Sequence, residues 1–184
     1  MADKEDQEGE QANSSTSKHQ GPLDMSTIPA HIVQTLHVCA THKKPKKLCH
    51  TIKKIRTDEQ EGGNKRRKGL IIVFFARIKT LQYIHQLLLK EGIQCVPFHS
   101  QMMQKQREMQ LNFFRSGKTP ILLATDIAAR GLHCNNVEYI INYDFPGSLD
   151  QVSLQMNNIF SHNNYMIYSS SSPVCSSMWK SWKE

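Results

Sequence analysis

The sequence predicts an α/β domain built on a mostly parallel β-sheet flanked by helices. Short apolar runs rich in β-branched and aromatic residues recur along the chain, and stretches with helical spacing of leucines and isoleucines separate them. Glycine or proline marks most of the boundaries. Because parallel neighbours need a crossover connection, this alternation favours a parallel sheet with right-handed connections.

The first expected strand covers residues 33–40, where Val and Leu alternate with Thr and His. A helix should follow, because Pro45 is tolerated in a first turn and Leu48, Ile52 and Ile55 then form an apolar stripe. Residues 61–64, Glu-Gly-Gly-Asn, are typical of a loop.

The continuously apolar run at residues 70–76 predicts a strand that is buried on both faces and lies at the sheet centre. Leu81, Ile84, Leu87 and Leu88 then fall at helical spacing, and Glu91-Gly92 provides a stop. A short strand at 95–99, a helix at 107–115 that ends at Gly117, and strands at 120–125 and 137–143 complete the pattern. A short helix is expected between the last two strands.

Composition divides the chain into three parts: a disordered acidic segment at 1–27, a folded domain at 28–151, and a serine-rich tail at 152–184. Residues 1–24 carry six Asp or Glu against two Lys, whereas residues 42–68 carry eleven Lys or Arg against three acids. The basic stretch could contact phosphates, serve as a nuclear import signal, or be a solvated helix face and a charged loop.

The five cysteines show no CxxC pairing, and no signal segment precedes them, which indicates reduced intracellular thiols. The nucleus or nucleolus is favoured over the cytoplasm. No apolar run reaches the roughly 18 residues of a membrane-spanning helix, so no membrane partner is expected.

Ligands of such folds lie beyond the carboxyl ends of the strands. The residues to examine for chemistry are therefore His99, Thr125-Asp126 and Tyr143-Asp144.

Several blocks in this region resemble DEAD-box RNA helicases. Residues 123–132, Leu-Ala-Thr-Asp-Ile-Ala-Ala-Arg-Gly-Leu, are similar to motif V, and residues 70–75 resemble motif IV. His99 to Gly117 resembles the family's HGxxxQxxRxxxLxxFRxG block, and Ile-Asn-Tyr-Asp-Phe-Pro at 141–146 resembles the strand and turn after motif V. The resemblance covers about residues 28–151 and implies the second, RecA-like domain, which closes with a first RecA-like domain over ATP and Mg and grips RNA.

The resemblance also implies site residues, for which no catalytic or metal role is expected. It implies that RNA is contacted by Arg107, Thr125, Gly117 and Arg77. Nucleotide contacts are implied for Gly131 and His133. Structural support of motif V is implied for Asp126 and Arg130. Two of these depart from the family, since Arg77 stands where Thr is common and His133 where Asp is usual. Structural alternatives remain open: Arg107 as a surface salt-bridge partner, and His99 as a residue that closes a strand end.

The chain lacks a GxxxxGKS or GxxxxGKT phosphate loop and an Asp-Glu-Ala-Asp sequence. After residue 151 it reads Val-Ser-Leu-Gln-Met instead of the arginines of motif VI, which stabilise the transferring phosphoryl group. We therefore expect a domain truncated before motif VI and incomplete at its C-terminus, with one sheet face exposed and residues 152–184 poorly ordered. Residues 165–168 could still pair as a strand.

The predicted function is that of a C-terminal domain fragment of an ATP-dependent RNA helicase. It would contribute RNA-backbone binding and half of an ATP site, be inactive alone, and bind neither ATP nor Mg tightly. Its expected partners are RNA and the first RecA-like domain, which is absent here. The alternatives are a non-catalytic RNA- or protein-binding module, a truncated product without folded function, and an unrelated nucleic-acid enzyme of the same fold.

Overall fold

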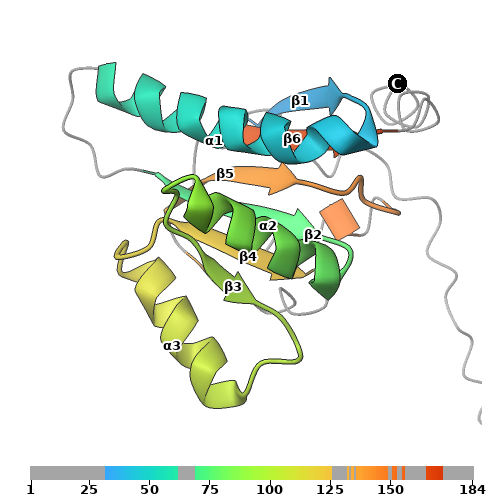
Figure 1. Ribbon diagram of the computed structural model, residues 1–184. Helices are drawn as coiled ribbons and strands as arrows, with labels where there is room; N and C mark the ends of the chain where they lie inside the picture. The colour runs from blue at the N-terminus through green and yellow to red at the C-terminus, as the bar shows by residue number, and fades with distance from the viewer. Residues whose placement is uncertain are drawn as a thin grey trace, which may run out of the picture.

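A six-stranded, entirely parallel sheet organises the computed structural model (Figure 1). The structure describes residues 32–61, 69–125, 132, 134, 136–148, 151–152, 155 and 165–171. The strands lie in the order β1-β6-β5-β2-β4-β3. Their bounds are β1 Val33–Val38, β2 Leu70–Phe75, β3 Val96–Phe98, β4 Ile121–Thr125, β5 Val137–Asn142 and β6 Tyr165–Ser170.

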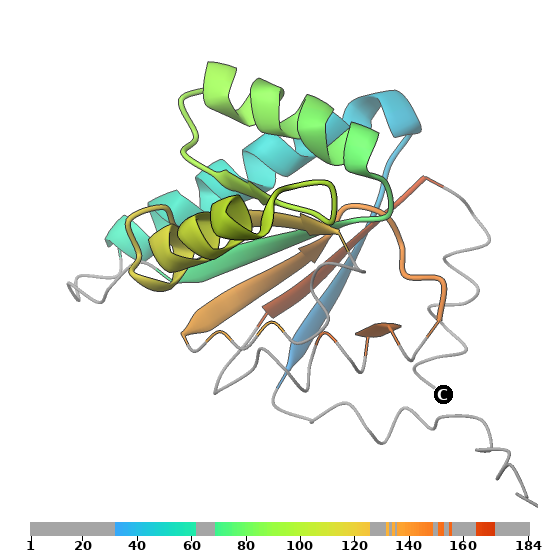
Figure 2. The same cartoon turned by 90° about the horizontal axis from the view of Figure 1, so that it is seen from below.

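Three α-helices connect and cover the strands: α1 Lys44–Glu61, α2 Ile78–Lys90 and α3 Gln104–Arg115, with a short 3₁₀ turn, η2 Thr41–Lys43, before α1. The cluster that contains the apolar residues of α1 and α2 lies on one face of the sheet, and Figure 2 shows both helices on that side. Phe114 of α3 belongs to the cluster on the other face, where it meets residues of β3 and β4. The predicted α/β fold class is confirmed.

Strand β2 lies at the centre of the core, as the sequence predicts. All six of its residues are buried, because β4 and β5 flank it and both faces are covered. Ile71, Val73 and Phe75 face α1 and α2, whereas Ile72 and Phe74 face the opposite cluster. This alternation follows from the two-residue period of a strand.

The sheet face expected to be exposed is covered, so that expectation is wrong for the described residues. On the face that holds Ile72 and Phe74, Ile140 of β5 and Met166 of β6 are fully buried. Leu132 and Val152 belong to the same cluster and cover part of this face. Side chains from the region after β4 thus close the core where the sequence predicts a gap.

Strand β6 lies within the segment 152–184, for which poor order is expected, and residues 165–170 are an exception to that expectation. It inserts between β1 and β5, with Val33 opposite Tyr165 and Tyr139 opposite Tyr165 on the other side. The Tyr168 ring is fully buried, and its hydroxyl donates a hydrogen bond to Oε1 of Gln34 at 3.1 Å. The expectation that residues 165–168 could pair as a strand is confirmed, whereas its place between β1 and β5 is not evident from any local pattern.

The other predicted elements agree with the structure to within a few residues. The helix predicted at 107–115 begins earlier, at Gln104, and Pro45 lies in the first turn of α1 as expected. The disordered segment 1–27, the glycine-rich stretch at 62–64 and the short helix after β4 lie outside the described residues. None of the described helices is long and apolar enough to cross a membrane.

Candidate functional site

Buried polar side chains gather where the strands end. Since all strands are parallel, their carboxyl ends lie at one edge of the sheet, here called the carboxyl edge. His99 follows β3, Thr125 ends β4, Asn142 ends β5, and Ser169 and Ser170 end β6. All of these residues are buried, whereas the residues of β2 and those of β4 before Thr125 are apolar. The strand-end positions of the predicted His99 and Thr125 are therefore observed.

Four buried polar atoms at or near this edge have no hydrogen-bond partner among the described residues: Nδ1 of His99, Nε of Arg107, Oγ1 of Thr125 and Nδ2 of Asn142. A buried donor or acceptor without a partner costs about 1–3 kcal/mol, so such atoms are scarce in folded proteins. Burial also lowers the pKa of His99, which favours the neutral form of its imidazole. The carboxyl edge thus holds polar groups that a ligand could satisfy.

Arg107 lies in the second turn of α3 and is held close to the end of β3. Its guanidinium lies 5.0 Å from the centre of the Phe98 ring, and its Nη1 donates to Oε1 of Gln104 at 3.4 Å. It makes no ion pair with any described residue, so the salt-bridge alternative is not observed in this part of the chain. The stacked, planar donor group suits a phosphate.

Arg77 is exposed and lies two residues after the end of β2. A charged pair stabilises this strand end. Asp144, after β5, accepts a hydrogen bond from the backbone N–H of Ala76 at 3.1 Å through Oδ2. Its other oxygen, Oδ1, lies 3.1 Å from Nζ of the buried Lys44, at the start of α1. Lys44 also lies 4.5 Å above the ring of Tyr143. Burial, followed by the Asp144 charge, raises the pKa of Tyr143 to about 12.

Gly117 lies away from this edge, just beyond the end of α3. Its φ of +73° is the left-handed conformation that a glycine adopts without strain, and its N–H donates to the Phe114 carbonyl at 2.9 Å. Arg107 and Gly117 therefore belong to opposite ends of the helix, and an RNA role for Gly117 stays a prediction. The predicted Asp126, Arg130, Gly131 and His133 lie outside the described residues.

The charges of the described edge do not fit a resident Mg²⁺, which prefers several oxygen ligands. No group of three or more His, Cys, Asp or Glu suited to a metal occurs among the described residues. Asp144 engages both of its carboxylate oxygens, one with Lys44 and one with the Ala76 N–H. Arginine and hydroxyl donors remain, and these suit phosphate oxygens instead.

Two residues at this edge were missed by reasoning from the sequence. Asn142 carries an unpartnered amide at the end of β5, and Lys44 anchors Asp144 from a position 100 residues earlier. A polar residue that ends the apolar run of β5 is a signal that could have found Asn142. Nothing local in the sequence links Lys44 to Asp144.

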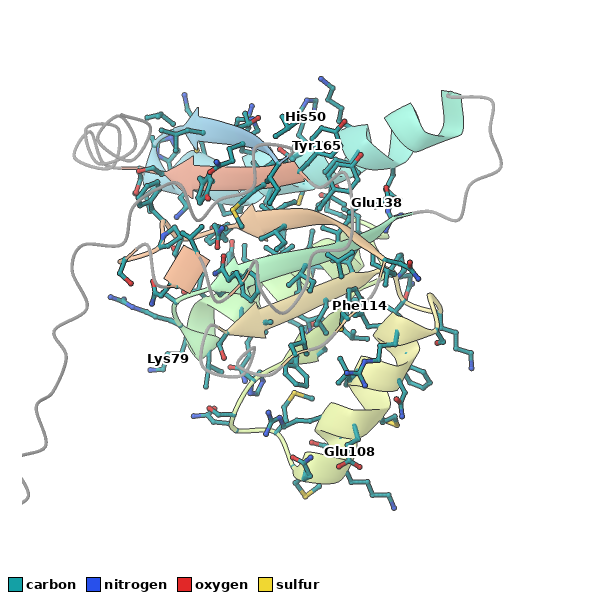
Figure 3. All side chains as sticks on the ribbon, turned by 180° about the vertical axis from the view of Figure 1, so that it is seen from behind. His50, Lys79, Glu108, Phe114, Glu138 and Tyr165 are labelled. Carbon is teal, nitrogen blue, oxygen red and sulfur yellow. The ribbon has the colours of Figure 1, made fainter. Side chains whose placement is uncertain are left out.

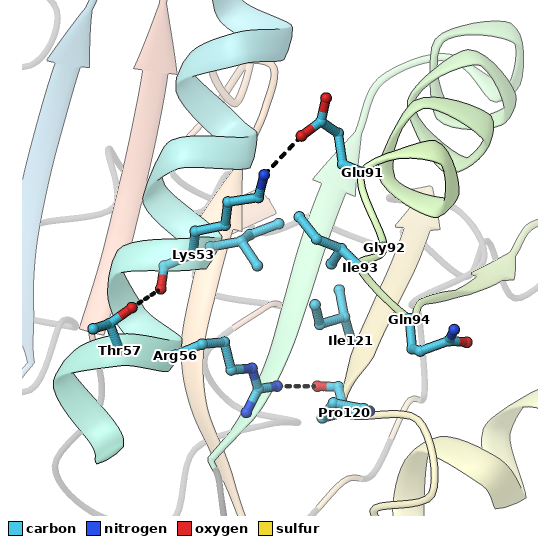
Figure 4. A pocket seen from close by; sticks show the side chains of 10 residues that line it. Lys53, Arg56, Thr57, Glu91, Gly92, Ile93, Gln94, Pro120 and Ile121 are labelled. Atoms are coloured by element: carbon cyan, nitrogen blue, oxygen red, sulfur yellow. Dashed lines mark hydrogen bonds and ion pairs between the residues drawn. The ribbon is translucent and has the colours of Figure 1, made fainter. Parts of the chain in front are cut away.

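A cleft of about 520 Å³ lies at the opposite edge of the sheet, between α1, the turn after α2 and the start of β4 (Figure 4). Lys53 and Glu91 form an ion pair across it at 2.7 Å, and Arg56 donates to the Pro120 carbonyl at 3.4 Å. Its lining includes none of the unpartnered polar atoms. The carboxyl edge is therefore the stronger candidate site.

Residues 43–158 match the helicase conserved C-terminal domain. The chain belongs to this family. Among curated relatives, it is 39% identical over 121 residues to a probable ATP-dependent RNA helicase, ddx5, of Dictyostelium discoideum, covering 66% of this chain and 16% of the relative. Against the mouse protein named probable ATP-dependent RNA helicase DDX17, the identity is 34% over 128 residues, or 70% of this chain and 18% of the relative. The chain spans less than a fifth of these relatives.

Solved structures share the fold at low sequence identity. The C-terminal domain of the DEAD-box protein Dbp5 superimposes with a TM-score of 0.67 at 20% identity, covering 83% of this chain and 84% of that domain. S. cerevisiae Dbp5 bound to RNA and ADP BeF3 gives a TM-score of 0.70 at 18% identity, over 87% of this chain and 42% of Dbp5. The predicted C-terminal RecA-like domain of a DEAD-box helicase is confirmed.

Proposed function

We propose that the chain is the C-terminal part of an ATP-dependent RNA helicase and that its carboxyl edge holds RNA by the sugar-phosphate backbone. The observation that carries this proposal is the set of buried, unpartnered polar atoms on Arg107, Thr125 and His99. A folded protein that keeps such atoms loses stability, and a ligand that pairs with them recovers it. The curated relatives that are named as RNA helicases support RNA as that ligand.

The side chains at this edge suit phosphate rather than bases. Arg107 and Arg77 offer charged guanidinium donors, and Thr125 offers a hydroxyl on the neighbouring strand end. Contacts of this kind position a nucleic acid without reading its sequence. We therefore expect binding that depends strongly on salt and weakly on RNA sequence.

For ATP, we propose that this chain supplies half of a site, through Gly131 and His133, and that a first RecA-like domain supplies the rest. No phosphate loop and no Asp-Glu-Ala-Asp sequence occurs in the 184 residues. Phosphoryl transfer relies on positioned phosphates and on charge stabilisation, which these motifs provide. The chain alone should neither hydrolyse ATP nor bind ATP and Mg tightly.

A second candidate function is a non-catalytic protein-binding module. One structural neighbour, the E. coli DEAD-box protein SrmB, was solved bound to the regulator of ribonuclease activity A, with a TM-score of 0.62 at 21% identity over 76% of each chain. Such a module would not need free phosphate-binding groups at the carboxyl edge. Retained RNA affinity of the chain in the absence of nucleotide would favour the RNA-binding function.

The substitution Thr125→Val separates these functions sharply. It keeps the shape of a side chain that is 5% exposed and removes a hydroxyl without a partner. We expect the free protein to become more stable by about 1 kcal/mol, because a desolvated group is lost, and to bind RNA more weakly. Thermal melts and fluorescence anisotropy with labelled single-stranded RNA across a KCl series measure the two effects.

Arg107→Gln tests the charged contact, and Lys105→Gln is its control on the exposed side of α3. Each phosphate contact with single-stranded nucleic acid contributes about 0.7 to the slope of log affinity against log salt. R107Q should reduce that slope by about this amount for every RNA sequence, and K105Q should change it little. If neither T125V nor R107Q weakens binding of a cooperatively folded chain, the carboxyl edge does not hold RNA.

A further inference from the structure

Helix α1 carries a row of exposed basic side chains that the carboxyl edge does not use. Lys46, Lys47, Lys53 and Lys54 are all exposed, and His50, labelled in Figure 3, lies between them in the sequence. Their spacing of three, four and seven residues places them on one side of a helix. This set is called the basic row of α1.

The basic row has almost no neutralising partner. Residues 42–57 contain no Asp or Glu, and within the described part of the chain the row makes one ion pair, Lys53 with Glu91 at 2.7 Å. Lys47 and Lys54 also act on a neighbour: after burial, their charges lower the pKa of His37 on β1. The row thus creates a positive potential that extends to the outer strand of the sheet.

Helix stability does not account for this arrangement. The first turn of α1 contains no acidic residue and carries Lys44, Lys46 and Lys47, while its last turn contains no basic residue. Cations at the start of a helix oppose its dipole, each at a cost of about 0.3–1 kcal/mol. A merely solvated helix face would gain from acids three or four residues away, but Lys46, Lys47 and Lys53 have no acid at these spacings and Lys54 has one, Asp58.

The basic row is also continuous with the carboxyl edge. Lys44, the first residue of α1, pairs with Asp144, which in turn holds the backbone of Ala76 beside Arg77. The 18 residues of α1 extend about 27 Å from there at 1.5 Å per residue. A strand of RNA bound at the edge can therefore continue along the helix.

We propose that the basic row of α1 is a second RNA-backbone surface, which extends the site at the carboxyl edge for longer single-stranded RNA. The inference rests on the proposed function. RNA is favoured over an acidic protein because none of the large hydrophobic side chains that are exposed in the described part of the chain lies on α1. Protein interfaces usually depend on such apolar or aromatic anchors.

The test compares two double variants of the full chain, K47Q/K54Q in the basic row and K90Q/K118Q at exposed lysines elsewhere. Both remove two positive charges. With fluorescein-labelled oligouridylate of about 16 nucleotides, K47Q/K54Q should lower the salt slope by about 1.4, or about 0.7 for each lost contact. K90Q/K118Q should leave it nearly unchanged. With an RNA of about 4 nucleotides, which the carboxyl edge alone can hold, both variants should bind like the unchanged chain.

A second readout follows the RNA directly. Phosphates on the basic row would offset Lys47 and Lys54, so the pKa of His37, measured by NMR, should rise when the long RNA binds. Equal salt slopes for the two double variants on the long RNA would overturn the inference. The inference would also be overturned if K47Q/K54Q lost its effect on the salt slope when it is combined with E5Q/E8Q/E10Q. That result would mean that the basic row binds the acidic N-terminal segment instead of RNA. Loss of short-RNA binding in R107Q tests the carboxyl edge separately.

Discussion

Tyr168 and Tyr165 offer a matched test of whether β6 is part of the folded core. Both are tyrosines of one strand, but Tyr168 is fully buried and Tyr165 is 44% exposed. Tyr168 contacts Phe145, with ring centres 5.8 Å apart, and donates a hydrogen bond to Gln34 on β1. Tyr165 stacks on Tyr139 at 5.1 Å with an interplanar angle of 13°.

The expected free-energy costs differ several-fold. Tyr168→Ala removes a whole buried ring, and truncating a large core aromatic costs about 3–5 kcal/mol. Tyr165→Ala mainly removes an exposed aromatic pair, worth about 0.5–1.5 kcal/mol. Since whole domains are stable by only about 5–15 kcal/mol, Y168A should remove a large part of the free energy of unfolding.

Urea denaturation followed by circular dichroism measures both variants. Y168A should lower the free energy of unfolding by at least about 1.5 kcal/mol more than Y165A. Its melting temperature should fall by roughly 10–20 °C, at a few degrees per kcal/mol for a domain of this size. Similar values for the two variants, or a melt that neither one changes, would show that β6 is not inserted between β1 and β5.

Three other predictions concern the charged and buried groups. Asp144→Ala should lower the free energy of unfolding by about 2 kcal/mol, because it leaves the buried Lys44 without its partner. Adding Lys44→Met to this variant should recover part of the loss in a double-mutant cycle measured by urea denaturation. Independent, additive effects of the two substitutions would contradict the pairing. Burial lowers the pKa of His37, His85 and His99, so the unfolded state binds more protons than the folded state when the pH falls below the ordinary histidine pKa of 6.5. The free energy of unfolding should therefore fall as the pH drops below 6.5. A urea midpoint that stays constant from about pH 7 to 5 would refute this. Cys95 is 5% exposed and burial raises its pKa to about 12, so iodoacetamide followed by mass spectrometry should modify it only after unfolding; fast modification of the native chain would contradict its burial.

Local patterns in the sequence predicted most of the α/β core. The run at residues 70–76 was sufficient to place β2 at the sheet centre, since a strand with no polar side chain must be buried on both faces. The parallel arrangement then predicted that His99, Thr125 and Asp144 follow strand ends at one edge. These placements depend only on period, length and connection rules.

The interactions that the sequence could not predict join distant residues. The Lys44–Asp144 pair spans 100 positions, and the pairing of β1 with β6 spans more than 130. Tyr-Met-Ile-Tyr at 165–168 is a weak strand signal by itself, and Met166 and Tyr168 are buried in the sheet that β6 forms with its two neighbours. The roles assigned to Gly131 and His133 came from the family resemblance and stay predictions.

The place of β1 in the sheet has a consequence for biosynthesis. Among the described strands, β1 pairs only with β6, so β1 has no neighbour in the sheet until β6 has been made. At about 5–20 residues per second, the 132 positions from Val33 to Tyr165 require roughly 7–26 s of translation. During that interval β1 is an unpaired edge segment open to chaperones, and the six-stranded sheet can be completed only after β6 has left the ribosome.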